Sequence, residues 1–325
     1  MIGMMNSAQM CKQVWPNLLN LRNLPQKDKV VVIMGVTGAG KSRLSIDLAT
    51  QFRGEIVNSD KIQVYKGLDI ATNKITHEER CGVPHHLLGI IDPYKEFTTT
   101  NFCNMASFAV SSITDSGKLP IIVGGSNSFI EALVHDNSYH FSTRYDCCFL
   151  WVDVSMNVLN SFLYERVDKM VDQGMINEVR SMFNPKNKDY TKGIRKAIGV
   201  PEFDSYFRAE LSNSVDIETR ERLLKEAINQ VKINNCKLAS RQLEKIKRLI
   251  NVNGGKIHRL DAAEVFRKKR KADEDEADKI WKNIVMGQSI KIVDKFLCEK
   301  NKKSMVYTSD GTAIAASAMA AASNY

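Results

Sequence analysis

A glycine-rich turn between an apolar run and a helical pattern constrains this chain more than any other feature. The apolar run covers residues 30–34, the segment GVTGAGKS follows it, and a helical pattern continues to residue 52. The spacing G-x-x-x-x-G-K-S is typical of loops whose backbone N–H groups bind phosphate oxygens at a helix N-terminus. A lysine there supplies charge to a diphosphate, and a serine hydroxyl can coordinate Mg²⁺. We therefore expect a diphosphate site at Gly35, Gly38, Ala39, Gly40, Lys41 and Ser42, with Ser42 as the magnesium ligand.

The order of apolar runs and helical patterns predicts an α/β fold with several parts. Short apolar runs at 56–57, 121–123 and 148–152 predict buried parallel strands, and residues 155–250 contain helical patterns without a strand signal. The fold class that follows is a P-loop NTPase-like core, with a parallel sheet flanked by helices and a smaller helical insertion domain. The expected parts are a flexible leader (1–28), a P-loop α/β core (29–154), a mainly helical substrate-covering region (155–250), a return to the core with a C-terminal helix (251–300) and a mobile tail (301–325).

Polar residues follow two of the predicted strands. Asp60 comes shortly after the strand near residue 56, and Ser126 follows the double glycine after residue 123. The carboxyl ends of strands in a doubly wound sheet line the ligand crevice, so both residues are expected near the bound ligand. An aspartate at such a position can equally cap a helix or a turn, and the segment alone leaves that alternative open.

The charge of the chain is concentrated in one stretch. The net charge is +9, and residues 225–270 hold thirteen Lys or Arg against four Asp or Glu, which equals the whole excess. A basic stretch favours phosphate-bearing partners, although a solvated helix face would have the same composition. No apolar run approaches the roughly 20 residues that span a bilayer, so we expect no membrane segment. The cysteines form no C-x-x-C pair, which favours a reduced compartment without structural zinc.

The first 27 residues are relevant to the compartment. They contain no acidic residue and include Lys12, Arg22 and Lys27 among apolar side chains, as some transit peptides do. They are also poor in serine and arginine, which fits an ordinary disordered leader. Plastid and cytosol therefore both remain open.

Six ordered motifs together resemble one family of enzymes. They are GVTGAGKS, NSDKIQVYKGLDIATNK, GVPHHLLG, IIVGGSNSF, GIRKAIGV and LASRQLEKIKRL. In this order they resemble the isopentenyltransferases, which include tRNA dimethylallyltransferases and, more closely, the plant adenylate isopentenyltransferases that begin cytokinin synthesis. The likeness extends from about residue 29 to residue 297.

The resemblance implies a reaction and roles for particular residues. The dimethylallyl group of dimethylallyl diphosphate is transferred to N6 of an adenine, and the loop binds the leaving diphosphate with Mg²⁺. Asp60 matches the family's general base and Thr37 the threonine that assists it, while Arg241 matches a diphosphate ligand. Further contacts to the phosphates of either substrate are implied at Lys74, Ser126, Lys192 and Arg195. Ser240 departs from the pattern because many relatives have lysine there.

The resemblance leaves the acceptor open between a free nucleotide and RNA. Eukaryotic tRNA-modifying relatives often carry a C-terminal zinc finger, and only Cys298 follows Cys236 here, so no such finger is expected. We expect ATP or ADP as acceptor, AMP less, tRNA as the alternative, and a monomeric enzyme. A nucleoside or nucleotide kinase would use the same loop with ATP, but no convincing Walker B acid is present. A nucleotide-dependent switch would leave Asp60 without a role.

Overall fold

The computed structural model describes residues 27–212, 214–252, 257–271 and 273–299, and two short strands further on. Residues Asp28–Cys298 form one compact unit. In the other unit, the described residues are an antiparallel pair of strands, β7 (Met305–Tyr307) and β8 (Ala313–Ala315). Almost all of the predicted leader (1–28) and most of the predicted tail (301–325) lie outside the described residues.

The compact unit is a single sheet with helices on both faces. Its strands are β1 (Asp28–Gly35), β2 (Gly54–Asn58), β3 (His85–His86), β4 (Leu119–Val123), β5 (Tyr145–Asp153) and β6 (Ile257–Asp261). Its α-helices are α2 (Lys41–Phe52), α3 (Thr99–Asp115), α4 (Asn127–His135), α5 (Phe141–Arg144), α6 (Met156–Asp172), α7 (Met175–Ser181), α8 (Asp204–Leu211), α9 (Ile217–Val252), α10 (Ala263–Arg270), α11 (Glu274–Ile280) and α12 (Gly287–Cys298). Short 3₁₀ turns cover Asn137–Tyr139 (η2) and Gly193–Lys196 (η3), and a π-helical turn covers Trp281–Met286 (η4).

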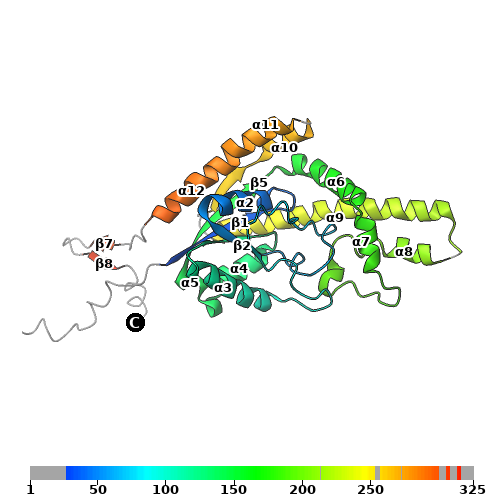
Figure 1. Ribbon diagram of the computed structural model, residues 1–325, viewed down its shortest axis with the longest axis horizontal. Coiled ribbons are helices and arrows are strands. Elements are labelled where there is room, and N and C mark those ends of the chain that lie inside the picture. Colours follow the sequence, from blue (N-terminus) through cyan, green and yellow to red (C-terminus); the bar gives the residue numbers. More distant parts are fainter. Residues whose placement is uncertain are drawn as a thin grey trace, which may run out of the picture. The chain divides into compact units, whose positions relative to one another are not determined.

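The six strands are all parallel and follow the order β3-β2-β4-β1-β5-β6. The central strand β1 lies between β4 and β5, with Val31 opposite Ile121 on one side and Cys148 on the other. A parallel strand covered on both faces is expected to be apolar throughout, as residues 30–34 are. The predicted parallel sheet flanked by helices is thus present (Figure 1).

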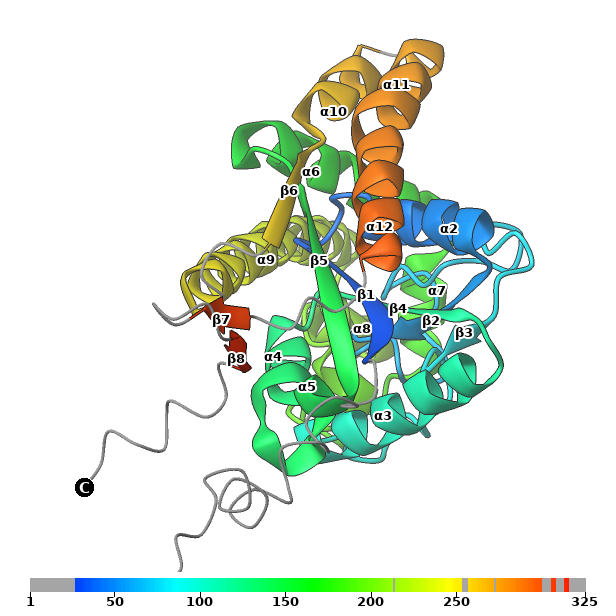
Figure 2. The same ribbon diagram turned by 90° about the vertical axis from the view of Figure 1, so that its left-hand side faces the viewer.

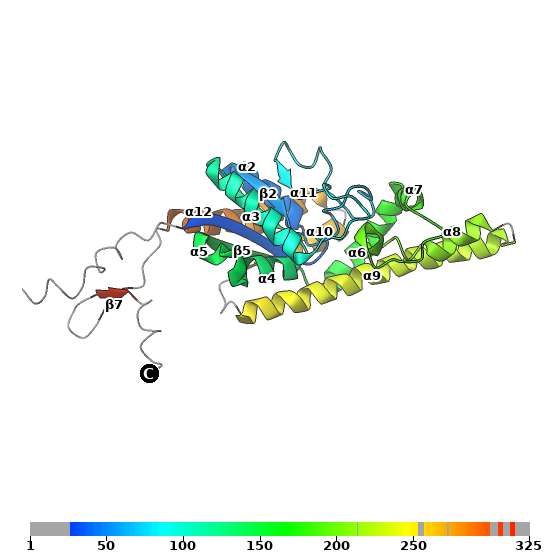
Figure 3. The same ribbon diagram turned by 90° about the horizontal axis from the view of Figure 1, so that it is seen from below.

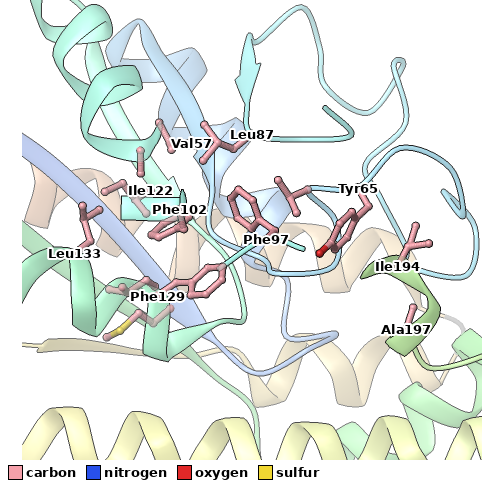
Figure 4. Close-up of a cluster of buried hydrophobic side chains, with 14 of the residues drawn as sticks. Val57, Tyr65, Leu87, Phe97, Phe102, Ile122, Phe129, Leu133, Ile194 and Ala197 are labelled. Carbon is pink, nitrogen blue, oxygen red and sulfur yellow. The ribbon is translucent and has the colours of Figure 1, made fainter. Parts of the chain in front are cut away.

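Alternate residues of β1 supply two separate cores. Val30 and Val32 point into one core with α3 and α4, whereas Val31 and Ile33 point into the other with α2 and α12. The two groups of helices lie on opposite sides of the sheet (Figure 2). In the first core, Phe129 of α4 stacks on Phe102 of α3 at 4.7 Å between ring centroids (Figure 4).

The region between residues 155 and 252 is helical and places α9 along the unit. At 36 residues this helix is about 54 Å long. Its N-terminal part lies beside α6 and α8, and its C-terminal part lies beside α4 and β1 (Figure 3). A long helix at this position can carry side chains to the carboxyl edge of the sheet.

The segment after α9 returns to the sheet and then continues as more helices than the sequence predicted. The expected return strand is β6, beside β5. The run of charged residues around 267–278 belongs to α10 and α11, because Val265, Phe266 and Ala277 bury one side of each helix against the core. The sequence did not predict these two helices, because the charged residues of their exposed sides outnumber the apolar residues of their buried sides.

Candidate active site

A cavity of about 960 Å³ lies at the carboxyl ends of β1, β2 and β4. The phosphate loop, the turn after β2 and the double-glycine turn after β4 form its floor. Side chains of α6, η3 and α9 cover it. Loops at the carboxyl ends of neighbouring parallel strands converge at one edge, which explains why distant segments meet here.

The phosphate loop has the backbone that its glycines permit. Gly38 and Gly40 adopt φ of +80° and +97°, a left-handed conformation in which a side chain would be strained. Gly40 is the N-cap of α2, so the first N–H groups of this helix face the cavity at its positive end. Thr37, Gly38, Gly40, Lys41 and Ser42 line the cavity.

Gly35 and Ala39 of the predicted set support the loop from behind. A Cβ atom on Gly35 would lie 2.7 Å from the carbonyl oxygen of Val152 in β5, so glycine allows the strands to approach closely. The Ala39 side chain is buried in the core. Both residues shape the loop, and only their backbone is available to a ligand.

Two cations beside the loop lack a carboxylate partner. Lys41 donates from Nζ to the carbonyl oxygen of Val36 at 2.8 Å, and burial lowers its pKa to about 8, although Asp60 opposes this shift. Arg166 of α6 donates to Thr37 Oγ1 at 3.2 Å and to Asn235 Oδ1 at 3.0 Å. Burial lowers the pKa of Arg166 to about 10, and its Nε has no hydrogen-bond partner among the described residues. Partly buried cations without a carboxylate partner favour an anionic ligand.

Thr37 is held on both its backbone and its side chain. Its N–H donates to Gln242 Oε1 at 2.7 Å, and Gln242 Nε2 donates to the carbonyl oxygen of Gly125 at 3.0 Å. One buried amide on α9 therefore joins the phosphate loop to the turn after β4. With Arg166 on its hydroxyl, Thr37 is fixed at the cavity wall.

Asp60 caps a turn and also lines the cavity, so its position is compatible with both roles that the sequence left open. Its Oδ1 accepts from the N–H groups of Ile62 at 2.8 Å and Gln63 at 3.2 Å, so the carboxylate caps the turn. Oδ2 accepts no hydrogen bond from the described residues, and Asp60 lines the cavity close enough to Lys41 to raise its pKa. One oxygen fixes the orientation of the carboxylate and the other remains available for a proton.

A second group of cations lines the cavity beyond the phosphate loop. It consists of Lys61, Lys196, Lys237, Arg241 and Lys245, which we call the outer cation group. Within the described part of the chain none of them forms an ion pair, and burial together with Lys61 lowers the pKa of Lys196. Against seven cations, the cavity presents the carboxylates of Asp60 and Glu244.

The structure does not bring three of the predicted phosphate contacts to the cavity. Lys74 donates to the carbonyl oxygen of Gly67 and to Asp69 Oδ1 at 2.7 Å. Arg195 is buried and donates to the carbonyl oxygens of Asp189 and Asn187, each at 2.9 Å. Lys192 is exposed, with Nζ 3.9 Å from Asp189 Oδ2. Backbone carbonyls of the chain itself satisfy Lys74 and Arg195, which gives these cations a structural role.

The remaining predicted residues lie in or near the cavity. Ser126 lines it, with Oγ accepting from the N–H of Lys61 at 3.0 Å, and Arg241 lines it from α9. Ser240, which replaces the usual lysine, donates to the carbonyl oxygen of Cys236 at 3.2 Å. Asp153, the last residue of β5 and the acid that a Walker B segment would place there, pairs with Arg259 of β6 at 2.7 Å.

The residues available to hold Mg²⁺ are those that phosphate loops usually provide. Among the described residues, no three His, Cys, Asp or Glu side chains cluster to hold an ion. Ser42 lines the cavity next to Lys41, and Mg²⁺ usually takes most of its ligands from phosphates and water. A site completed by a bound diphosphate therefore fits these residues.

Sequence reasoning missed Arg166, Gln242 and Lys196. Gln242 and Lys196 stand inside the quoted motifs, beside Arg241 and Arg195, so each was adjacent to a residue that was chosen. Arg166 lies in an amphipathic pattern in which it resembles any exposed arginine. Only the packing of α6 over the loop distinguishes it.

Comparison with known proteins identifies the family of this chain. The model of the family described as IPP transferase matches residues 63–142 and 135–248. The chain is 54% identical over 302 residues to adenylate isopentenyltransferase 3, chloroplastic, of Arabidopsis thaliana, covering 93% of this chain and 88% of that protein. This chain belongs to the IPP transferase family.

Other members of the IPP transferase family give the same result. The adenylate isopentenyltransferase of Humulus lupulus is 47% identical, with 82% of this chain and 90% of that protein covered. The Arabidopsis adenylate isopentenyltransferase 7, mitochondrial, is 52% identical, with 86% and 83% covered.

Solved structures of tRNA-modifying enzymes have the same fold. A eukaryotic dimethylallyltransferase acting on tRNA superposes with a TM-score of 0.69 at 23% identity, over 89% of this chain and 92% of that one. The tRNA isopentenylpyrophosphate transferase of Bacillus halodurans gives 0.62 at 27% identity, over 78% and 99%. The predicted P-loop NTPase-like fold is confirmed. Within the described residues, no helix is long and apolar enough to cross a membrane.

Proposed function

We propose that this protein transfers the dimethylallyl group of dimethylallyl diphosphate to N6 of the adenine of ATP or ADP, with AMP a poorer acceptor. The product of this step is an isopentenyl adenine nucleotide, as in the first step of cytokinin biosynthesis. The names of its relatives as adenylate isopentenyltransferases support this assignment.

One observation carries the proposal: one cavity is lined by two groups of cations without a carboxylate partner and by the carboxylate of Asp60. Lys41 and Arg166 adjoin the phosphate loop, and the outer cation group lies toward η3 and α9. Two anionic substrates require two such sets. A carboxylate with an available oxygen then serves the reacting amine.

The chemistry follows from the groups at the loop. As the bond between C1 of the allyl group and the bridging oxygen breaks, negative charge develops on diphosphate, and fixed donors stabilise it. The loop N–H groups, Lys41 and Arg166 are such donors, and hydrogen bonds set the orientation of the two side chains before substrate binds. Arg241, which lines the same cavity from α9, is the further donor that the family resemblance assigns to this diphosphate. Mg²⁺ bound beside Ser42 would add to this neutralisation.

The acceptor amine is a poor nucleophile because its lone pair is delocalised into the adenine ring. N6 attacks C1 while the carbon–oxygen bond breaks, and the N6 proton passes to Asp60 Oδ2. The turn around Ile62 and Gln63 fixes the carboxylate through Oδ1. The Thr37 hydroxyl, held by Arg166, assists in orienting the amine.

The outer cation group supports a nucleotide with more than one phosphate. Lys61 and Lys196 repel each other and lie beside the same cavity, so an added phosphate between them relieves an unfavourable interaction. We therefore propose ATP or ADP over AMP. A tRNA acceptor and phosphoryl transfer to a nucleoside or nucleotide are the alternatives that the experiment must exclude.

The decisive experiment is product analysis. Purified protein is incubated with Mg²⁺, dimethylallyl diphosphate and, separately, AMP, ADP, ATP or unmodified tRNA. The proposal expects isopentenyl-ATP and isopentenyl-ADP, with less isopentenyl-AMP. Modified tRNA alone would overturn the acceptor, and phosphorylated product without prenylation would indicate a kinase.

The proposal also concerns the compartment in which the protein acts. Relatives named chloroplastic and mitochondrial support an organelle as the compartment.

A further inference from the structure

The phosphate loop rests on an indole from the C-terminal part of the compact unit. A Cβ atom on Gly40 would lie 2.9 Å from both Cη2 and Cζ3 of Trp281, so the ring edge is in direct contact with this glycine. Trp281 is 2% exposed. Any movement of Gly40 away from the cavity is blocked by the ring.

Two further contacts fix the indole against α2. Its Nε1 donates to Asp47 Oδ2 at 2.7 Å, and the Arg43 guanidinium carbon lies 4.6 Å from the ring centroid. Arg43 in turn pairs with Asp278 of α11 at 2.8 Å. Residues 40, 43 and 47 share one side of α2, so the indole contacts this side along two turns.

The backbone around Trp281 is unusual in a way that suits this role. The ring is carried by the first residue of η4, a π-helical turn between α11 and α12. Such turns are rare and are often found at functional sites. This segment lies beyond residue 248, where the match to the family model ends.

We propose that Trp281 is a positioning residue for diphosphate, which sets the orientation of the loop N–H groups from behind. The inference rests on the proposed binding of diphosphate to this loop. Donors to a developing charge must be in place before the reaction. A displacement of about 1 Å can cost on the order of 10²-fold in rate. An indole that excludes one direction of movement therefore contributes to affinity and catalysis without touching the substrate.

The test compares two tryptophans of the same core. Trp281→Leu removes the ring that contacts Gly40. Trp151→Leu removes the indole of β5, which is 8% exposed and lies against Arg259. Calorimetric titration with inorganic diphosphate and Mg²⁺ is carried out well below the unfolding temperature of each variant. We expect Trp281→Leu to weaken diphosphate binding about tenfold and Trp151→Leu to leave it within about twofold. The KM for dimethylallyl diphosphate should rise in parallel, with the KM for nucleotide unchanged.

A milder set of variants covers the case in which Trp281→Leu does not fold. Trp281→Phe and Asp47→Ala each remove the Nε1 hydrogen bond, whereas Asp47→Asn keeps an acceptor for it. We expect about threefold weaker diphosphate binding in the first two, and wild-type binding in Asp47→Asn.

The outcomes separate this inference from the proposed function. Unchanged binding in Trp281→Leu, or an equal loss in Trp151→Leu, would overturn the positioning role. So would equal binding in all three milder variants. Failure of the wild-type protein to bind diphosphate would instead overturn the proposed function on which the inference rests.

Discussion

In the proposed mechanism, the Asp60 carboxylate serves the fold and the reaction through different atoms. Oδ1 accepts from two backbone N–H groups, and Oδ2 is the oxygen left for chemistry. Asparagine keeps an oxygen for the turn and removes the negative charge. Asp60→Asn therefore separates the two roles better than alanine, which removes both.

We expect Asp60→Asn to reduce kcat by about 10²–10⁴-fold, the usual contribution of a general base. Diphosphate affinity and thermal stability should remain close to wild type, because the capping oxygen and the loop are preserved. Steady-state kinetics and calorimetric titration measure the two effects. A kcat within a few fold of wild type would remove Asp60 from the mechanism.

Lys41 should make diphosphate binding dependent on pH. Burial lowers the pKa of Lys41 to about 8, so the lysine of the free enzyme loses its charge as the pH rises through this value. A bound anion favours the ammonium form, so binding takes up a proton above pH 8 and affinity falls with rising pH. Lys41→Met should bind diphosphate more weakly, with a flatter pH profile.

The measurement for Lys41 is the dissociation constant of diphosphate between pH 7 and pH 9.5 in both proteins. The ionisation of the ligand is common to both, so the difference between the two profiles isolates Lys41. Parallel profiles would exclude the lysine as the titrating group.

At the scale of elements, the sequence predicts those features that depend on residues close together in the chain. The strand, loop and helix around Gly38 and Gly40 form a continuous pattern, and the carboxyl-edge rule places Asp60. Arg166 and Lys196 reach the cavity only because α6 and η3 pack over that edge. The direction in which a surface cation points depends on this packing, which no local pattern records. For the same reason Lys74 and Arg195, though within motifs, bind carbonyl oxygens of the chain itself.

The turn η3 offers a direct comparison between sequence and structure. Lys192, predicted from a motif, is exposed outside the cavity, whereas Lys196, four residues later, lines it. We expect Lys196→Met to raise the KM for ATP by about tenfold and the KM for AMP less, because a lost charge–phosphate contact is typically worth about 1.5–3 kcal/mol before solvent screening. Lys192→Met is the matched control and should change neither. Equal effects of the two variants would indicate that Lys192 contacts the nucleotide phosphates as Lys196 does.

At the scale of the molecule, the pairing of charges distinguishes the site from the scaffold. Ion pairs join β2 to β3 and α9 to α4, while the cations of the cavity have none among the described residues. Carboxylates thus stabilise the framework where no ligand binds, and cations are left unpaired where phosphate is expected.

The sheet edge at β2 provides a prediction for the stability of the whole unit. Glu55 is buried, its Oε2 accepts from His86 Nε2 of β3 at 2.7 Å, and its Oε1 accepts from Lys118 before β4. Burial alone would raise the pKa of Glu55, but the hydrogen bonds from Lys118 and His86 outweigh it and hold the pKa below its usual value. The ionised carboxylate therefore joins three consecutive segments of the sheet.

Glu55→Gln should lower stability at neutral pH by about 1–2 kcal/mol, because both partners are partly exposed and solvent screens them. For a unit of this size that is about 3–6 °C in Tm. A depressed carboxyl pKa contributes stability that is present above the unfolded value, near 4.5, and lost as the pH falls through the folded value. The difference between Glu55→Gln and wild type should accordingly shrink as the pH falls below 4.5. Thermal unfolding across this range tests the prediction, with Glu165→Gln on the exposed side of α6 as control. A difference that grew as the pH fell below 4.5 would mean that the protonated carboxyl is the form that stabilises the sheet edge.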